Sequence, residues 1–311
     1  MTTTQVAERP PTRPARRRMG RRLEPVLYIA PAFLVMAAII GYPVVSAIGT
    51  SFLHSSLAKP GQDTFAGLAN YGALFSSADF LGVVGRTLLW AGACLITQVG
   101  LALVVANLLN KKLFARGVFR TAMIVPWVVP TVLVALIWRF LLDPAQGPVN
   151  TLLRDSGILT NPPAWLADTS TALPALVLIS AWKWTPFAAV ILLAGMQQIP
   201  GELYEAAVVD GAGAFRRWLH ITLPGIRTSM ALVCLTTIAG SINNFNGIWL
   251  FTRGGPVGAT DILTTVAYRT AFQDLDLGMA ATISVVIFVF MLLIAVLYFF
   301  AVEGRKKWGV R

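Results

Sequence analysis

Amide, hydroxyl and aromatic side chains that could bind a carbohydrate occur within stretches that are otherwise apolar. Asn243 and Asn244 lie beside Phe245 and Trp249, and Ser241 precedes them. Amides and hydroxyls donate and accept hydrogen bonds, as sugar hydroxyls require, and the electron-rich face of an aromatic ring attracts the C–H edges of a sugar ring. The same asparagines and serines could instead hydrogen-bond between helices, so both roles remain open for each residue.

Catalytic and metal-binding chemistry is not indicated. A phosphate-binding P-loop needs Gly-Lys followed by Ser or Thr, and none of the lysines follows a glycine. His54 and His220 have no Cys, Asp or Glu at ligand spacing, which argues against a metal site. No nucleophile has a plausible general base beside it. The sequence therefore predicts no catalytic residue, no metal and no cofactor in this chain.

A compact charged segment, Glu205–Gly225 (EAAVVDGAGAFRRWLHITLPG), interrupts the apolar sequence. Pro200, with acids behind it, is typical of a helix start. Gly211 suits the residue after a helix end, where a positive φ is easy only for glycine. A second short helix is expected over Phe215–Leu223, and Pro224 is expected to end it. The sequence thus predicts two short helices that fold at Gly211.

Two roles fit this helix pair. The small residues Ala206 and Ala207 let another surface approach closely, and the acids beside them suit neither the bilayer nor anionic lipid. These features favour docking to a partner protein. Alternatively, Phe215 and Trp218 could insert into the lipid headgroups and hold the segment on the membrane surface. The pattern alone is compatible with either role.

Composition restricts the elements that can position these residues. The 311 residues are 56% hydrophobic and only 13% charged, with a mean hydropathy of +0.69, whereas soluble domains carry about a quarter charged residues. A helix of about 20 apolar residues crosses a bilayer and satisfies its own backbone hydrogen bonds there. We therefore predict an all-α polytopic membrane protein. Its membrane domain covers 25–303, with six spans at about 26–53, 84–109, 117–141, 172–197, 228–251 and 277–302.

Positive charges are distributed unevenly between the connections. Seven of the 25 Lys and Arg lie in the first 24 residues and eleven more follow the second, fourth and sixth spans, whereas the opposite connections hold four. This asymmetry places both termini and the connection 198–227 in the cytoplasm. The tail 1–24 is predicted to be disordered and basic, and the short tail 304–311 is predicted to be basic. Their expected partner is membrane lipid with anionic headgroups and not nucleic acid.

Lys183 is the exception within an apolar stretch. It lies about 11 residues into the fourth span, near mid-depth at about 1.5 Å per residue, where a charge is costly. We expect its side chain to face a pathway or an acidic group. The predicted spans contain no acid, so its counter-charge would come from a backbone carbonyl, the solute or another subunit.

The charged segment also resembles a known family motif, the EAA signature of permease subunits of binding-protein-dependent ABC importers. The residues that match this signature are Glu205, Ala206, Ala207, Gly211, Ile221, Leu223 and Pro224. The stretches Ser241–Pro256 (SINNFNGIWLFTRGGP) and Phe65–Phe75 (FAGLANYGALF) are similar to the carbohydrate-uptake, maltose-type branch of that family. The resemblance covers most of the chain but not its N-terminal tail.

This resemblance implies that 198–227 is a pair of cytoplasmic coupling helices that docks on a separate ATPase subunit. Glu205 would face an arginine of the ATPase, and Gly211 would form the turn. Ala206, Ala207 and Asp210 would lie in or beside the contact. ATP-Mg would be bound by the partner ATPase subunits and not by this chain.

In maltose-type permeases, the matching stretches of the fourth and fifth spans line the sugar site. Carried over, the implied pathway residues are Ser180, Trp184, Phe187, Thr237, Gly240, Ser241 and Asn244. Lys183 and Asn243 complete the predicted set. Gly240 and Ser241 are smaller than the side chains that the family can place there, so the substrate need not resemble maltose.

The predicted function is that of a permease subunit in an ATP-driven importer of a mono-, di- or oligosaccharide in the plasma (inner) membrane. The implied partners are a second homologous permease, two copies of an ATP-binding subunit and an extracytoplasmic solute-binding protein. A polyol phosphate such as glycerol phosphate is an alternative solute. An ion-coupled secondary transporter is less favoured, because it would need a carboxylate within the spans. A membrane scaffold would use the charged segment only as an interaction site.

Overall fold

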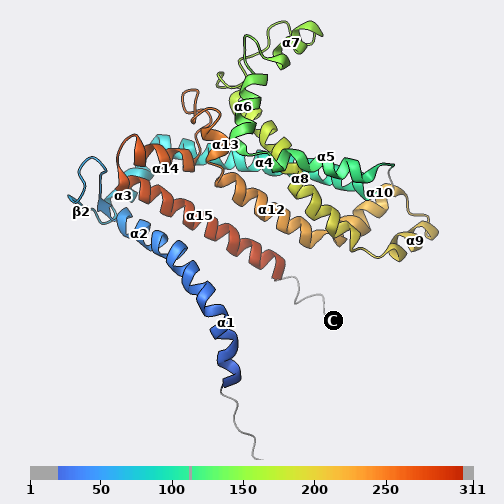
Figure 1. Cartoon of the computed structure of the whole chain (residues 1–311), viewed down its shortest axis with the longest axis horizontal. Helices are drawn as coiled ribbons and strands as arrows, with labels where there is room; N and C mark the ends of the chain where they lie inside the picture. Colours follow the sequence, from blue (N-terminus) through green and yellow to red (C-terminus); the bar gives the residue numbers. More distant parts are fainter. Residues whose placement is uncertain (1–19, 112–113, 304–311) are drawn as a thin grey trace, which may run out of the picture. The chain divides into compact units, whose positions relative to one another are not determined.

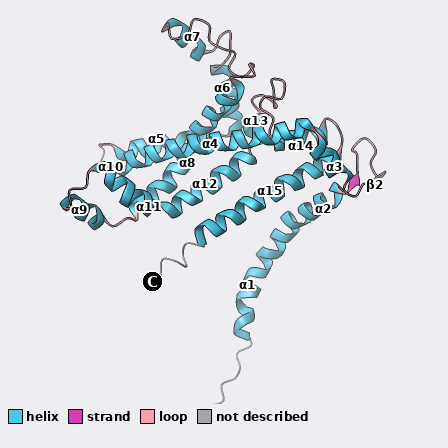
Figure 2. Ribbon diagram, turned by 180° about the vertical axis from the view of Figure 1, so that it is seen from behind, coloured by secondary structure: helices cyan, strands magenta, loops and turns pink. Residues whose placement is uncertain are grey.

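Helices make up nearly all of the described structure (Figure 2). The computed structural model describes residues 20–111 and 114–303; most of the predicted tail 1–24, Lys112 and the tail 304–311 lie outside the described residues. In chain order the elements are α1 (Gly20–Met36), the π-helix η1 (Ala37–Gly41), α2 (Tyr42–Ser51), β1 (Leu53–His54), β2 (Thr64–Phe65), α3 (Ala69–Ser76), α4 (Ala78–Asn110), α5 (Arg116–Val128), α6 (Thr131–Leu141), α7 (Pro148–Asp155), α8 (Ala172–Gln197), α9 (Gly201–Val209), α10 (Ala214–Arg217), the π-helix η2 (Trp218–Thr222), α11 (Leu223–Gly225), α12 (Arg227–Ile242), α13 (Asn246–Trp249), α14 (Leu263–Phe272) and α15 (Leu277–Glu303).

Contacts divide the chain into two compact units, one up to Ala47 and one from Ile48 onward. In the first unit, α1 passes through η1 into α2 with helical backbone throughout. The apolar side chains from Tyr28 onward are exposed on all faces, a pattern that suits contact with lipid. Helix α1 begins at Gly20, ahead of the predicted start near 26, because the Arg and Leu that follow Gly20 are good helix formers.

Helices α4, α8 and α12 form the centre of the second unit (Figure 1). Helix α4 packs along α8, α12 packs against both, and α14 packs on α15. Ala102 and Ala106 of α4 belong to the same buried cluster as Ala188 and Ala189 of α8. Small side chains let helices approach closely in a membrane, where packing replaces the hydrophobic effect. The alanines of these two helices therefore account for their close pairing.

Four helical stretches are long and apolar enough to cross a membrane singly, and two bent pairs raise the number to six if each pair forms one span. Helices α8 and α15 agree with the predicted spans 172–197 and 277–302. Helix α4 begins at Ala78, ahead of the predicted 84, because the Ser77 hydroxyl accepts a hydrogen bond from the Phe80 N–H (3.4 Å) and caps it.

The predicted third span, 117–141, is not one straight helix. Helices α5 and α6 meet at an angle of 94°, and Val129, the first of the two residues between them, has extended backbone angles (φ −63°, ψ 128°). Pro130 explains the break, because a proline ring disfavours helical angles at the residue before it and supplies no N–H. The predicted span 117–141 therefore contains a bend, and its crossing of the membrane as one span stays a prediction.

The predicted fifth span, 228–251, is also interrupted. Helix α12 ends at Ile242 and the short α13 follows after a three-residue break. The Asn244 side chain accepts a hydrogen bond from the Gly247 N–H (3.0 Å). Asparagine side chains that bind nearby backbone compete with the helical ladder, which accounts for a restart of the helix here.

The connection 143–171 contains a short helix, α7. The Trp165 Nε1–H donates to the Asn150 amide oxygen (2.6 Å) and fixes α7 against the following loop. Further along, the Ser170 hydroxyl donates to the Asp168 carboxylate (2.6 Å), as does the Ser170 N–H. These hydrogen bonds lower the pKa of the Asp168 carboxyl from its ordinary value, and the bond from the hydroxyl has the larger effect.

Candidate functional site

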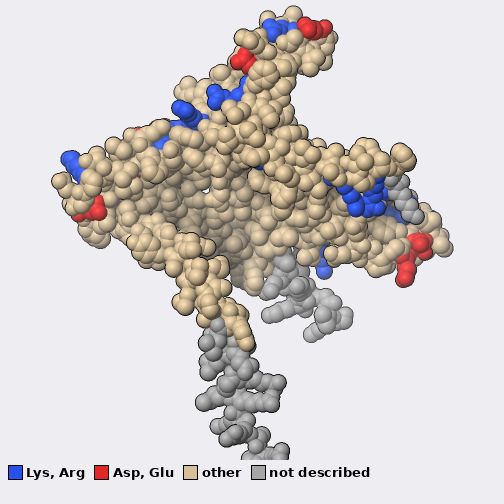
Figure 3. Space-filling view, in the orientation of Figure 1, with Lys and Arg blue, Asp and Glu red and all other residues tan. Residues whose placement is uncertain are grey.

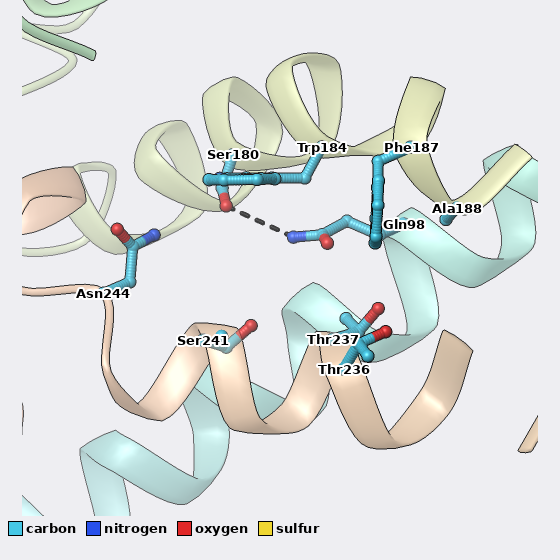
Figure 4. Close-up of a pocket in the computed structure, with 10 residues that line it drawn as sticks. Gln98, Ser180, Trp184, Phe187, Ala188, Thr236, Thr237, Ser241 and Asn244 are labelled. Carbon is cyan, nitrogen blue, oxygen red and sulfur yellow. Dashed lines mark hydrogen bonds between the residues drawn. The ribbon is translucent and has the colours of Figure 1, made fainter. Parts of the chain in front are cut away.

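A pocket of about 100 Å³ lies between α4, α8 and α12 (Figure 4). Its described lining combines hydroxyls, amides and aromatic rings and includes no charged side chain. The lining residues are Gln98, Ser180, Trp184, Phe187, Ala188, Thr236, Thr237, Gly240, Ser241 and Asn244. This set contains every pathway residue that the family resemblance nominated, on the two helices that it indicated.

Helix α8 supplies the aromatic wall of the pocket. Ser180, Trp184 and Phe187 are spaced by four and three residues and therefore share one helical face. The indole and the phenyl ring are each 38% exposed, so part of each ring is available for contact with a solute. Ala188, which follows on the same face, is buried and takes little room.

Helix α12 supplies the opposite wall, which is mainly polar. Thr237 and Ser241 are one turn apart and point towards α8 in Figure 4, as does Thr236. Asn244, beyond the end of α12, closes the same face. A side chain added at Gly240 would meet nothing within 4 Å. The size of the pocket is therefore set in part by the missing side chain at 240.

Helix α4 contributes Gln98, a residue outside the predicted set. The Gln98 amide donates to the Ser180 hydroxyl (3.2 Å; dashed in Figure 4), and both side chains are buried. The Trp90 indole N–H donates to the Ser241 carbonyl oxygen (2.9 Å). Polar contacts thus connect α4 to both walls. A glutamine in the middle of an apolar span is costly, and this cost was the sequence signal that could have identified Gln98.

Lys183 does not line this pocket, but it lines a small adjoining cavity of about 10 Å³ together with Ser180, Trp184 and Asn244. Its side chain is 6% exposed, its Nζ donates to the Val129 carbonyl oxygen (2.6 Å), and it lies 5.5 Å from the centre of the Trp184 ring. The sequence left a backbone carbonyl, the solute or another subunit open as the partner of the Lys183 ammonium, and in the structure the partner is a backbone carbonyl. That carbonyl belongs to the break between α5 and α6, so Lys183 connects α8 to the bend.

Asn243 is separated from the other nominated residues. Its amide donates to the Ala239 carbonyl oxygen (3.1 Å) of its own helix. It lines a different groove, of about 490 Å³, together with residues of α14 and α15 such as Thr264 and Ser284. Asn243 and Asn244, which follow the end of α12, therefore line two different cavities.

The charged segment forms a short helix on either side of Gly211, α9 before it and α10 after it. Gly211 has φ +74°, and the Ala212 N–H donates to the Ala207 carbonyl oxygen (2.8 Å), as in a glycine-terminated helix. Glu205, Ala206 and Asp210 are exposed, and Ala207 is half-buried. Helix α9 has no buried residue. The predicted helix end and turn at this glycine are therefore present.

The second helix of the segment differs from its prediction at Pro224. The backbone passes from α10 through η2 into α11, which includes Leu223, exposed Pro224 and Gly225. The Leu223 N–H donates to the Trp218 carbonyl oxygen in the wide π register. A proline ring clashes with the carbonyl four residues earlier, and a π-turn relieves this clash. Pro224 is therefore accommodated and does not end the helix.

A hydrogen bond joins the two halves of the segment. The hydroxyl groups of Tyr204 in α9 and Thr222 in η2 lie 2.9 Å apart. Thr222 is buried, whereas Leu203, Val209 and Phe215 are exposed apolar side chains. The segment is thus internally fixed and presents an apolar and acidic outer surface, which is suited to contact with another protein.

Comparisons with known proteins agree with this architecture. Residues 98–304 match the family described as binding-protein-dependent transport system inner membrane component. The trehalose/maltose transport system permease protein MalF of Thermococcus litoralis is 33% identical over 273 residues, which cover 88% of this chain and 91% of that protein. The sn-glycerol-3-phosphate transport system permease protein UgpA of Agrobacterium fabrum is 30% identical over 289 residues, covering 93% and 97%.

A solved structure shares the fold. The crystal structure of a bacterial alginate ABC transporter, in complex with an alginate pentasaccharide-bound periplasmic protein, contains a chain that matches with a TM-score of 0.77 and 22% identity. The match covers 90% of this chain and 96% of that chain. The family resemblance carried by the EAA residues is thereby confirmed. The chain belongs to the family of binding-protein-dependent transport system inner membrane components, and it is a multi-pass protein of the inner membrane.

Proposed function

We propose that this chain is the permease subunit of an ATP-driven importer and forms half of the pathway for a sugar. The observation that carries this proposal is the pocket between α4, α8 and α12. The buried hydroxyls of Ser180 and Ser241 and the amide of Asn244 offer donors and acceptors to sugar hydroxyls. Trp184 and Phe187 offer ring faces. Few precisely placed polar groups in an apolar wall are typical of small-molecule sites.

The two named relatives suggest different solutes, a disaccharide and a polyol phosphate. The described lining of the pocket is uncharged, and the ammonium of Lys183 is directed to the Val129 carbonyl instead. A phosphate in this pocket would lack a cationic partner. A neutral sugar is therefore the favoured solute, and a polyol phosphate is the alternative.

The proposed energy source is a pair of separate ATPase subunits that bind ATP-Mg, since no Gly-Lys-Ser/Thr sequence occurs in this chain. The segment 198–227 would face the cytoplasm and dock on one of them. Glu205 and Asp210 are exposed beside small residues, as a contact surface for a cationic partner requires. Movement of this segment would tilt the spans and switch the pathway between inward- and outward-open states.

The proposed complex also contains a second permease and a solute-binding protein. Six spans enclose little space, and the pocket here is only about 100 Å³, so a homologous partner would complete the pathway. A periplasmic protein accompanies the similar alginate transporter. We propose an equivalent extracytoplasmic protein as the source of solute for this chain.

Reconstitution of the four components in proteoliposomes tests the proposal. We expect ATP hydrolysis to rise when solute-loaded binding protein is added, and labelled sugar to accumulate in the lumen. Glycerol phosphate, offered with its own binding protein, is the comparison solute. Uptake that needs no ATPase but follows an ion gradient would support a secondary transporter. Stimulated hydrolysis without uptake of any solute would indicate a scaffold.

A further inference from the structure

Two arginines converge on one neutral side chain where the end of α8 meets the start of α5. With its amide oxygen turned towards them, Gln197 accepts hydrogen bonds from the Nη2 groups of Arg116 and Arg120, each at 2.7 Å. Helices α5 and α8 pack together here. Two like charges are thus held close to each other by a single amide dipole, which cannot neutralise either of them.

The described part of the chain supplies no anion to this arginine pair. The ion pair found among the described side chains, Asp261–Arg269, lies elsewhere. The Nε atoms of Arg116 and Arg120 are buried and have no hydrogen-bond acceptor within the described residues. Because the Nε groups are enclosed, an oxyanion from outside would bind through the outer Nη groups, and arginine binds phosphate and carboxylate through such N–H donors.

The surroundings of the arginine pair indicate which oxyanion fits. Phe114 is 97% exposed, Val118 68% and Phe119 56%. Apolar side chains that alternate with arginines at the end of a spanning helix match the boundary between lipid headgroups and acyl chains. On the face drawn in Figure 3, Lys and Arg gather at the right-hand end and along the upper edge, and the surface below that edge is largely uncharged.

We propose that Arg116 and Arg120 bind the phosphate of an anionic phospholipid, whose acyl chains lie against Phe114 and Phe119. In the topology proposed above, this end of α5 meets the cytoplasmic leaflet, where anionic lipids attract basic groups. The lipid neutralises the arginine pair and fixes the start of α5 to the end of α8. This site is independent of the solute that the chain carries.

Native mass spectrometry of the full-length chain in detergent tests this site. The probes are phosphatidylglycerol and phosphatidylcholine with identical acyl chains, and inorganic phosphate. We expect retention of phosphatidylglycerol in preference to phosphatidylcholine. Each cation near an anionic lipid contributes about fivefold to affinity, so the double variant Arg116→Gln/Arg120→Gln should bind phosphatidylglycerol about 25-fold more weakly. Arg139→Gln, which removes an exposed arginine of α6, is the matched control and should change nothing.

Several outcomes would overturn the proposal. Equal retention of the two lipids by the wild-type chain would do so, as would full binding by the double variant. Competition by inorganic phosphate at equal concentration would assign the site to free phosphate. Loss of the lipid when the ATPase subunits assemble would assign the arginines to a protein carboxylate. If the double variant does not fold, Arg116→Lys/Arg120→Lys replaces it, because this variant keeps both charges. The salt dependence of lipid binding by the wild-type chain then decides whether the charges bind the lipid.

Discussion

Lys183→Met is the substitution that tests how α8 is connected to the bend between α5 and α6. Methionine keeps an unbranched apolar side chain but removes the ammonium that donates to the Val129 carbonyl oxygen at 2.6 Å. Lys183 is buried at 6% exposure. The carbonyl at the break would then lack its donor in a place where water is scarce.

The expected cost follows from the two opposing effects of this substitution. A hydrogen bond from a charged donor contributes about 1.5–3 kcal/mol, and a buried acceptor left without a partner costs about 1–3 kcal/mol. Removal of a buried charge relieves part of its desolvation penalty, but the carbonyl remains in place. We therefore expect a net loss of about 1–2 kcal/mol in the free energy of unfolding. The transport rate should fall, and the apparent KM for the solute should stay unchanged, because Lys183 does not line the 100 Å³ pocket.

Thermal unfolding in detergent measures the stability change, and uptake by proteoliposomes gives the rate and the apparent KM. Arg139→Met is the matched control, because it also replaces a cation by methionine but at an exposed position of α6. Equal stability of Lys183→Met, Arg139→Met and the wild-type chain would refute the proposed connection. A large rise in KM with an unchanged rate would instead place Lys183 at the solute.

Four further substitutions, at three positions, test the pocket and the charged segment. Gly240→Ala should stabilise α12 by about 0.5–1 kcal/mol, measured by thermal unfolding, and Gly92→Ala, in α4 and equally unobstructed, is the control. Gly240→Leu should fill the pocket and abolish uptake. Normal uptake by Gly240→Leu would contradict the proposed pathway. Gln98→Leu should raise the apparent KM about fivefold through the loss of one hydrogen bond; an unchanged KM would limit Gln98 to a packing role. Glu205→Lys should reduce coupled ATP hydrolysis and uptake about tenfold or more, with normal membrane insertion. Glu202→Lys, in the same helix, is the control and should have less effect. Full uptake by Glu205→Lys would exclude the docking role.

The positions of the long helices could be predicted from the sequence, because apolar length and helix-end signals are local properties. Helix α8 and the turn at Gly211 follow directly from such signals. The breaks in the third and fifth spans could not be predicted in the same way. Pro130 is visible in the sequence, but proline kinks a helix by an amount that depends on the packing around it. The break at Asn243–Phe245 depends on a hydrogen bond from Gly247 to Asn244 that only the folded chain reveals.

The candidate pocket was predictable in part. Ser180, Trp184 and Ser241 were nominated by the family resemblance, which supplied the register of two helices. Gln98 belongs to a third helix, and its place became clear only when α4 was seen to pack along α8. Asn243 was nominated because its side chain suits a sugar, but its position just after α12 directs it to a different groove.

The segment from Gln198 to Ile226 begins at the end of α8 and ends at the start of α12, the two helices that face each other across the pocket. Its two halves are tied together by Tyr204 and Thr222. If the proposed function holds, a force applied to this segment would act on both helices together. It would change the angle between α8 and α12, and so widen or narrow the pocket proposed for the solute, without contact to the solute itself.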